Sequence, residues 1–489
     1  MSHLYPPELL IRRFLARAGV AAMAIAMALS VPSTKGHAID WQLNQTATAQ
    51  ITFSDNVDLD PDAQAESAIT PSASYSISGT GRGGRVLFST SSRLRLSADS
   101  NDEELDVDQA IRLFGRAELW RDRFFLDGSV SSTQELISVS GRTTANNNNN
   151  SDQDTVTSIS ISPIYQERFG QWADSQLSYR HTEIFTSGNS SEDARADALQ
   201  LTVSGGQRLK VFQPSFTAGW FRFDEDENGG NSDDIEQFSV QFSSTYQFTR
   251  KYGAIATVGY DNVTTPGSTR ELGGFFWSAG VTMTPGPRTQ LSLQVGRRYD
   301  SFGIVGSGSY QITPRLRLSL SATQDVGTGL QRAGTQVQRI SVANQQGGLS
   351  GPNGLPPGFL RSDLDNGISI NQIISFGVTG TYGRNTVNFG GTNERRDFDQ
   401  GTENLRQLRL TVSRDFSRRV TGSVNMFYRY VDERTGADTH AVGGRATINY
   451  RLGSRTTVFA GVSRTDRFSA DATEEFTENT VFFGGSLRF

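Results

Sequence analysis

The chain ends in Thr480-Val481-Phe482-Phe483-Gly484-Gly485-Ser486-Leu487-Arg488-Phe489, and this stretch decides the fold. Its odd-numbered residues are Val, Phe, Gly, Leu and Phe, whereas its even-numbered residues are mostly Thr, Gly, Ser and Arg, with Phe482 as the exception. Successive side chains of a β-strand point to opposite faces, so this period of two indicates a strand with one apolar and one polar face. We therefore expect a C-terminal strand that ends on an aromatic residue.

Such a strand resembles the closing strand of bacterial outer-membrane β-barrels. In those barrels the C-terminal aromatic residue, here Phe489, is the signal that the barrel-assembly machinery recognises. Alternating final strands also occur in soluble β proteins, whose polar face meets outside solvent and whose apolar face meets a core. The strand alone leaves both classes open, and the rest of the chain must separate them.

The first 38 residues have the features of a secretory signal peptide. Three arginines precede the apolar run 18–31, and a small-residue cleavage pattern ends at Ala38. The run is too short to span a bilayer as a helix, which needs roughly 20 residues. We expect residues 1–38 to be removed after secretion and residues 39–489 to form a single domain.

Composition favours a membrane barrel over a soluble protein of this size. Hydrophobic residues make up 36% of the 489 residues, which is low for a chain that must fill several cores. A transmembrane barrel needs apolar side chains only on its outward face, because its inward face meets water. The chain has no cysteine, which excludes disulfides and thiolate metal sites, and its net charge of -5 gives no indication of nucleic-acid binding.

Alternating segments recur along the whole mature chain. They predict an all-β, antiparallel up-and-down transmembrane barrel of about 22 strands, within a range of 20 to 24, and an even number is typical of bacterial single-chain barrels. The expected strands are 41–53, 68–80, 85–98, 108–120, 123–136, 154–168, 173–186, 195–207, 212–223, 235–249, 252–262, 274–284, 289–299, 302–313, 315–326, 367–383, 385–397, 404–416, 419–431, 440–452, 456–468 and 476–489.

The connections between these strands alternate between short and long. Short ones, such as 121–122 and 417–418, alternate with longer acidic or Asn-rich ones such as 55–66 and 138–151. Outer-membrane barrels have short periplasmic turns and long extracellular loops. We therefore expect an outer-membrane location with both termini in the periplasm, and a longest extracellular loop at about 328–366 that folds into the mouth of the barrel or hangs free.

Several segments together resemble a known family. They are Gly273–Val281, Thr284–Thr289, Gly296–Tyr299, the Tyr310–Leu316 turn and the early Phe53–Val57. These segments resemble the outer-membrane barrels associated with the PEP-CTERM/exosortase system, which accompany exopolysaccharide genes in Gram-negative bacteria. The family has no established activity. The resemblance thus implies a location and possible exopolysaccharide export partners, but no mechanism.

Placing the apolar faces outward puts a set of arginines in the lumen. An excess of inward positive charge in a water-filled channel favours the entry of anions. The alternative is that these arginines pair with carboxylates and brace the wall, for which the planar guanidinium is well suited. The expected lumenal arginines are Arg93, Arg95, Arg112, Arg180, Arg317, Arg409, Arg429 and Arg445.

One acidic connection has the spacing of a calcium-binding loop. Asp224, Asp226 and Asn228 precede Gly229, as in an EF-hand loop, but the twelfth position is Ile235 instead of Glu. The alternative is a solvated acidic surface loop, which binds no specific metal, and we expect no resident cofactor. Lipid and lipopolysaccharide are the expected surroundings of such a barrel.

Catalytic motifs are absent from the sequence. The mature chain keeps two histidines, His181 and His440, and has no G-x-S-x-G, H-E-x-x-H or phosphate-binding loop. An enzyme is therefore not expected. Two functions remain open: a pore or channel component for exopolysaccharide export or anionic solutes, and a structural or surface-attachment barrel with a blocked lumen.

Overall fold

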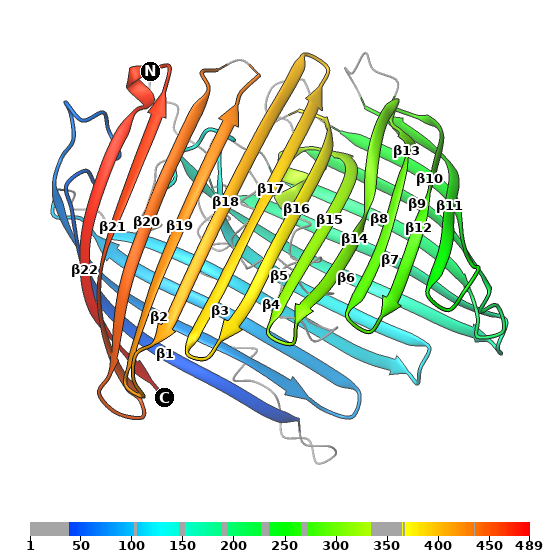
Figure 1. Ribbon diagram of the computed structural model, residues 1–489, viewed down its shortest axis with the longest axis horizontal. Coiled ribbons are helices and arrows are strands. Elements are labelled where there is room, and N and C mark those ends of the chain that lie inside the picture. Colours follow the sequence, from blue (N-terminus) through cyan, green and yellow to red (C-terminus); the bar gives the residue numbers. More distant parts are fainter. Residues whose placement is uncertain are drawn as a thin grey trace, which may run out of the picture.

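The protein is a closed β-barrel. The computed structural model describes residues 39–101, 105–145, 152–187, 193–225, 234–265, 272–333, 364, 367–434 and 436–489. These residues form 22 antiparallel strands in one sheet and one short 3₁₀ helix (Figure 1). The expected fold class and strand number are confirmed.

Every expected strand is present, and no observed bound differs from the expected one by more than three residues. The elements are β1 (Asp40–Ser54), β2 (Ala68–Arg82), β3 (Val86–Ala98), β4 (Leu105–Trp120), β5 (Phe124–Leu136), β6 (Gln153–Phe169), β7 (Ala173–Thr186), β8 (Ala194–Gly205), β9 (Phe212–Glu225), β10 (Ile235–Gln247), β11 (Tyr252–Thr264), β12 (Gly274–Gly286), β13 (Thr289–Arg298), β14 (Ser301–Thr313), β15 (Leu316–Gly327), β16 (Ser369–Tyr382), β17 (Asn385–Phe398), β18 (Gly401–Asp415), β19 (Val420–Asp432), β20 (Thr439–Arg451), β21 (Thr456–Ser469), η1 (Ala472–Glu474) and β22 (Phe476–Arg488).

The first and last strands close the barrel. Each strand pairs with its neighbours in the chain, and β1 pairs with both β2 and β22. In the closing pair Thr46 lies opposite Arg488 and Ser54 lies opposite Thr480. The backbone N–H of Phe489 donates to the carbonyl oxygen of Gln45 at 3.1 Å, so the final aromatic residue is tied to the first strand. Closure leaves no strand edge unpaired in the wall.

The two ends of the barrel differ in their connections. We call the end that carries Ile39, Phe489 and the short connections the turn end, and the opposite end the loop end (Figure 1). Two loop-end connections, 299–300 and 399–400, are as short as those of the turn end. In the first of them Tyr299 and Asp300 both have positive φ values, 54° and 56°. Two successive residues with positive φ form a two-residue hairpin turn whose backbone twist matches that of the flanking strands.

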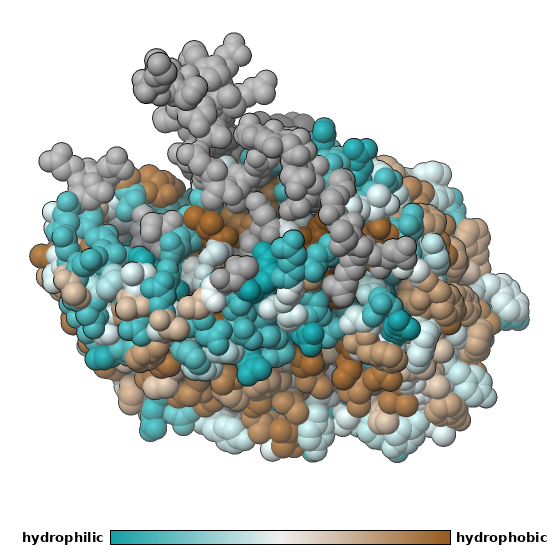
Figure 2. Space-filling view, turned by 90° about the horizontal axis from the view of Figure 1, so that it is seen from above, coloured by the Kyte–Doolittle hydropathy of each residue, from teal (hydrophilic) through white to brown (hydrophobic). Residues whose placement is uncertain are grey.

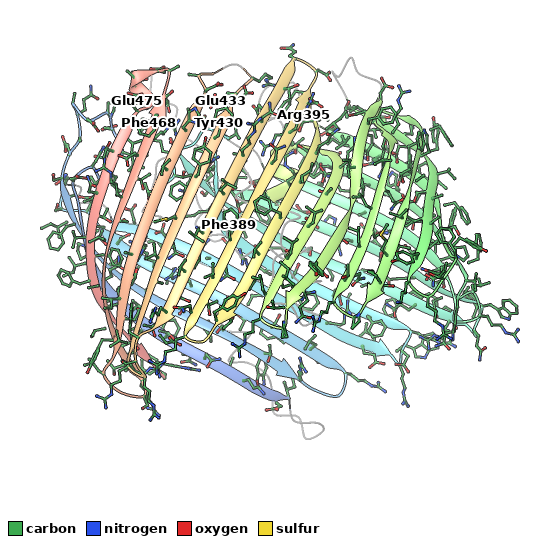
Figure 3. The ribbon with its side chains drawn as sticks, viewed as in Figure 1. Phe389, Arg395, Tyr430, Glu433, Phe468 and Glu475 are labelled. Atoms are coloured by element: carbon green, nitrogen blue, oxygen red, sulfur yellow. The ribbon has the colours of Figure 1, made fainter. Side chains whose placement is uncertain are left out.

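The outward face is apolar between the two ends. Exposed large hydrophobic residues occupy alternate positions, for example Val481, Phe483 and Leu487 on β22, whereas Phe482 is fully buried on the inner face. Figure 3 shows Phe389 midway along the wall and Arg395, six residues later on β17, close to the loop end. Figure 2 shows hydrophilic residues gathered over the loop end and hydrophobic residues on the outer flank. This is the surface that an outer-membrane barrel requires.

The expected signal peptide, 1–38, lies outside the described residues. Within the part of the chain that the structure describes, no helix has the length and apolar character needed to cross a membrane.

Candidate functional site: the lumen and its loop-end strap

All eight expected arginines occupy positions that face the lumen. Their positions alternate with the outward residues of their strands, as that of Arg409 does between Leu408 and Leu410. They differ in exposure: Arg93 and Arg317 are exposed to the lumen, Arg429 is 7% exposed, and the others are half-buried. The inner wall therefore carries accessible positive charge at some levels and covered charge at others.

Other lumenal arginines brace the wall through carboxylates. Arg116 on β4 pairs with Asp127 on β5 through two guanidinium–carboxylate bonds of 2.6 Å. Arg298 donates to both oxygens of Asp261, at 2.7 and 3.0 Å, and Asp261 is 1% exposed. Arg396, 2% exposed, donates to Glu394 at 2.7 Å. Glu394 is on the same strand as Arg396, and the contact of Arg396 with the next strand is its ion pair with Glu403 on β18 at 3.7 Å. A paired carboxylate neutralises the charge, so these three arginines brace the wall rather than attract ions.

These bracing arginines were not among the expected site residues. Arg116 lies four residues after Arg112 on the same strand, so the two-residue alternation already places it on the lumenal face. Pattern alone does not reveal the carboxylate partner, which comes from the next strand.

A loop-end connection crosses the lumen. Residues 137–145, which we call the strap, follow β5 and contact the inner face of β18, β19 and β21. The guanidinium of Arg429 on β19 donates to the carbonyl oxygens of Val139 and Gly141, the latter at 3.3 Å. Arg467 on β21 donates to the carbonyl oxygen of Ser140 at 2.5 Å. Around the shorter side of the barrel, β5 and β19 are eight strand steps apart, so these contacts join opposite parts of the wall.

Apolar packing and further hydrogen bonds hold the strap in place. Val139 is 3% exposed and packs against Leu405 and Val431, which face the lumen on β18 and β19. At the end of the strap the N–H of Ala145 donates to Oγ1 of Thr465 at 2.9 Å. Arg429 is therefore covered by the strap, and its observed contacts agree with bracing, not with an open pore lining.

The longest connection also turns inward where it is described. Residues 329–333 form a helical turn after β15, and Arg332 donates to Oδ1 of Asn371 at 2.8 Å. Leu364 donates its N–H to the carbonyl oxygen of Leu136, the last residue of β5, at 2.8 Å. Leu330, Ala333 and Leu364 pack on the inner apolar side chains of the facing strands β6–β10, which are Val156, Ile184, Ala194, Ala196, Phe223 and Ile235. Of the expected loop 328–366, the stretches 334–363 and 365–366 lie outside the described residues.

Inward phenylalanines lie flat against the wall. Phe482 lies opposite Gly461 in register, and a Cβ on that glycine would collide with the ring. Phe427 lies in the same way over Gly443. Because the glycine has no side chain, the ring can lie across the neighbouring strand instead of projecting into the lumen.

The expected calcium ligands are only partly described. Asp224 faces outward at the end of β9 and accepts from Nε of Arg222 at 2.7 Å, with Nε of Arg195 at 3.5 Å. Asp226 and Asn228 lie outside the described residues. Among the described residues no group of three or more His, Cys, Asp or Glu side chains is placed to hold a metal ion. The calcium hypothesis stays a prediction.

Both histidines among the described residues, His181 and His440, face outward near the loop end. His181 contacts Oδ1 of Asp197 at 2.8 Å and Oε1 of Glu183 at 2.9 Å. His440 contacts the hydroxyl of Tyr428 at 3.2 Å, and its ring lies 4.7 Å from that of Tyr430. Neither of these two histidines faces the lumen.

Comparison with known proteins bears on the fold. No protein-family model matches the chain, and no curated protein matches it. The ferric-catecholate import receptor Fiu from E. coli K12, in its open form, has 10% sequence identity over 92% of this chain and 82% of that one, with a TM-score of 0.51. The siderophore receptor PirA from Acinetobacter baumannii has 8% identity over 93% and 81% of the two chains and a TM-score of 0.49. The FrpB iron transporter from Neisseria meningitidis has 11% identity over 91% and 81%, also with a TM-score of 0.49. At 10% identity the similarity to Fiu shows a shared outer-membrane barrel fold and carries no information about substrate.

Proposed function

We propose that this protein is an outer-membrane channel for anionic solutes that is closed at its loop end by its own connections. The observation that carries the proposal is the strap, which runs inside the barrel from β5 to β18, β19 and β21 above a polar, arginine-bearing lumen. Outer-membrane transporters with 22 strands have a plugged lumen, because a barrel of that width is too wide to remain open and selective. Here the chain's own connections supply an obstruction.

The remaining lumenal surface suits small charged solutes. Inward positions of β8–β14 are mostly Ser, Thr, Gln and Gly, and Arg93 and Arg317 present exposed guanidinium groups elsewhere on the wall. Fixed positive charge inside an aqueous pore lowers the free energy of an entering anion and raises that of a cation. Anion preference follows if the lumen conducts.

Orientation and partners belong to the same proposal. Short turns are periplasmic in barrels of this class, which places both termini in the periplasm and the strap on the cell surface. Lipopolysaccharide would surround the loop end, and the barrel-assembly machinery would recognise Phe489. A link to exopolysaccharide export rests on the sequence resemblance alone, and we propose no enzymatic activity or resident cofactor.

A second candidate is a structural barrel whose lumen never opens. The pairs of Arg298 with Asp261 and of Arg396 with Glu403 favour it, because each joins different strands and stiffens the loop-end wall. Conductance separates the two candidates.

The test is single-channel recording of the refolded protein in a planar bilayer, with the reversal potential measured under a salt gradient. We expect conductance with anion preference, and we expect the double substitution Arg317→Glu with Arg409→Glu to shift the reversal potential toward cation preference. A matched control, Arg418→Glu, changes a charge in the exposed turn-end connection after β18 and should leave the reversal potential unchanged. A barrel that stays silent under all conditions, including release of the strap, overturns the channel in favour of the structural barrel.

A further inference from the structure

The turn end of the barrel carries an excess of positive charge. Every turn-end connection contains an arginine or a lysine, or follows one within two residues. The charge is densest over the connections 383–384, 416–419 and 452–455, which follow β16, β18 and β20 and lie next to one another at the turn end in Figure 1. We call the arginines in and beside these three connections the basic patch; they are Arg384, Arg414, Arg418, Arg419, Arg451 and Arg455. All six are exposed, and the stretches 382–385, 414–420 and 450–456 hold one carboxylate, that of Asp415.

Hydrogen bonds between the connections hold the patch together. The N–H of Asp415 donates to the carbonyl oxygen of Arg384 at 2.9 Å, and Nη1 of Arg384 donates to the carbonyl oxygen of Phe416 at 3.2 Å. The N–H of Arg451 donates to the carbonyl oxygen of Arg419 at 2.8 Å. The first two bonds join the connection after β16 to the one after β18, and the third joins the connection after β18 to the end of β20. The backbone of adjoining strands therefore fixes how close these arginines lie to one another.

The positive charges of the patch are not neutralised by carboxylates of the protein. Among the described residues, which include every turn-end connection, none of the six arginines forms an ion pair with a carboxylate. The carboxylate of Asp415 instead accepts from Oγ1 of Thr421 at 3.0 Å. Cζ of Arg414 lies 5.7 Å from the centre of the Phe416 ring, a contact that uses the face of the guanidinium and leaves its N–H groups available. The patch thus presents N–H donors to a ligand outside the barrel.

Exposed aromatic and aliphatic side chains border the patch. They lie at or next to the ends of β16, β18 and β20 and are Tyr382, Phe416, Tyr450 and Leu452. The ring of Phe416 lies against Gly422, where an added Cβ would come within 2.6 Å of it. In outer-membrane barrels such residues form the girdle at the level of the lipid headgroups. The arginines beside them therefore lie at the level of the lipid phosphates.

We propose that the basic patch binds the phosphodiester headgroups of anionic phospholipids, such as phosphatidylglycerol, in the membrane leaflet at the turn end. Guanidinium groups bind phosphate oxygens through paired N–H donors, and each Lys or Arg near an anionic bilayer surface raises the affinity for it about fivefold. Positive charge continues around the barrel in the other turn-end connections. Lipid surrounds a barrel on every side, whereas a protein partner covers one side, so this distribution favours lipid over an acidic protein. The surface lies outside the wall and does not depend on whether the lumen conducts.

The test uses a fluorophore placed in the patch. The chain has no cysteine, so Ser454→Cys, at an exposed position in the connection after β20, provides a single site for labelling. The full labelled chain is refolded into phosphatidylcholine vesicles that contain a small fraction of either phosphatidylglycerol or phosphatidylcholine carrying a nitroxide quencher at the same acyl carbon. We expect the anionic lipid to quench roughly fivefold more strongly at equal mole fraction, and the difference to shrink in high salt.

Two triple variants of the labelled chain separate the patch from the total charge of the protein. The test variant carries Arg414→Gln, Arg418→Gln and Arg419→Gln, and it should reduce the preference for the anionic lipid to less than about twofold. The matched control removes the same charge from exposed outward arginines near the loop end, with Arg395→Gln, Arg406→Gln and Arg464→Gln. The control should keep the full preference. All six side chains are exposed, and heat-modifiable gel migration confirms that each variant is folded.

The remaining outcomes overturn the proposal or separate it from the channel. Equal quenching by the two lipids in the wild type, or the same loss in both triple variants, refutes lipid binding at the patch. If the wild type shows no lipid preference but polyglutamate in detergent shifts the fluorescence of the probe, the patch binds an acidic protein and the lipid proposal is wrong. Lipid preference in a barrel that never conducts keeps the patch and refutes the channel. Conductance without lipid preference does the reverse.

Discussion

Releasing the strap is expected to open the barrel. The strap is held by three contacts from arginine to backbone carbonyls, two from Arg429 and one from Arg467. A hydrogen bond with one charged partner contributes about 1.5 kcal/mol or more. Replacing both arginines, Arg429→Met with Arg467→Met, therefore removes about 4.5 kcal/mol from the closed state. Since about 1.4 kcal/mol corresponds to a factor of ten, the ratio of closed to open states should fall roughly a thousandfold.

The assay is single-channel recording, with the fraction of time spent open as the measured quantity. The wild type should conduct rarely, and the double variant should conduct for much longer at the same voltage. Arg317→Met is the matched control, because it removes a lumenal arginine that lies away from the strap and should change selectivity without changing the open fraction. The reasoning is refuted if the folded double variant and the wild type show the same open fraction.

Three further predictions concern the wall and its assembly. Gly461→Ala should lower the thermal unfolding temperature in detergent, because the new Cβ would collide with the Phe482 ring and reduce the free energy of unfolding by about 1–3 kcal/mol. Gly453→Ala is the control, because a Cβ at that position meets nothing within 4 Å. Asp261→Asn should lower the urea midpoint by the equivalent of about 1.5–3 kcal/mol, since the half-buried guanidinium of Arg298 loses its charged hydrogen bonds, and an unchanged midpoint would show that the pair contributes nothing. Phe489→Ala should reduce the amount of assembled protein in outer-membrane fractions while leaving refolding in detergent intact, and equal amounts in both fractions would exclude an assembly signal.

The strands could be predicted from sequence because their pattern is local. Alternation over 10 to 17 residues marks each of them, and polar or glycine-rich connections mark where they end. The same alternation placed all eight expected arginines on the correct face. A period of two residues specifies on which side of the sheet a side chain lies, but it says nothing about what lies across the lumen. The side on which each arginine lies was therefore predictable, whereas the role of each arginine was not.

Arg409 and Arg429 show where prediction stops. Both are inward arginines on neighbouring strands, and their local sequences are equivalent in pattern. Arg429 is buried because Gly141, 288 residues earlier, supplies a carbonyl from the strap. A contact over that separation depends on which connection folds inward, and loop conformation is set by tertiary packing and not by periodicity. The strap residues, with Ile137 and Val139 among small and polar neighbours, carry no signal that distinguishes them from an exposed loop.

The inner surface below the strap argues against a barrel built only as a support. A supporting barrel gains stability by filling its interior, yet the inward rings of Phe427 and Phe482 lie across glycines instead of projecting into the lumen. A glycine in a strand weakens the sheet, so this arrangement costs stability that a bulkier residue would supply. Among the described residues the strap at the loop end is held by hydrogen bonds that can exchange with water. Inward rings turned aside along the wall, together with replaceable contacts at one end, favour the proposed gated channel over a support.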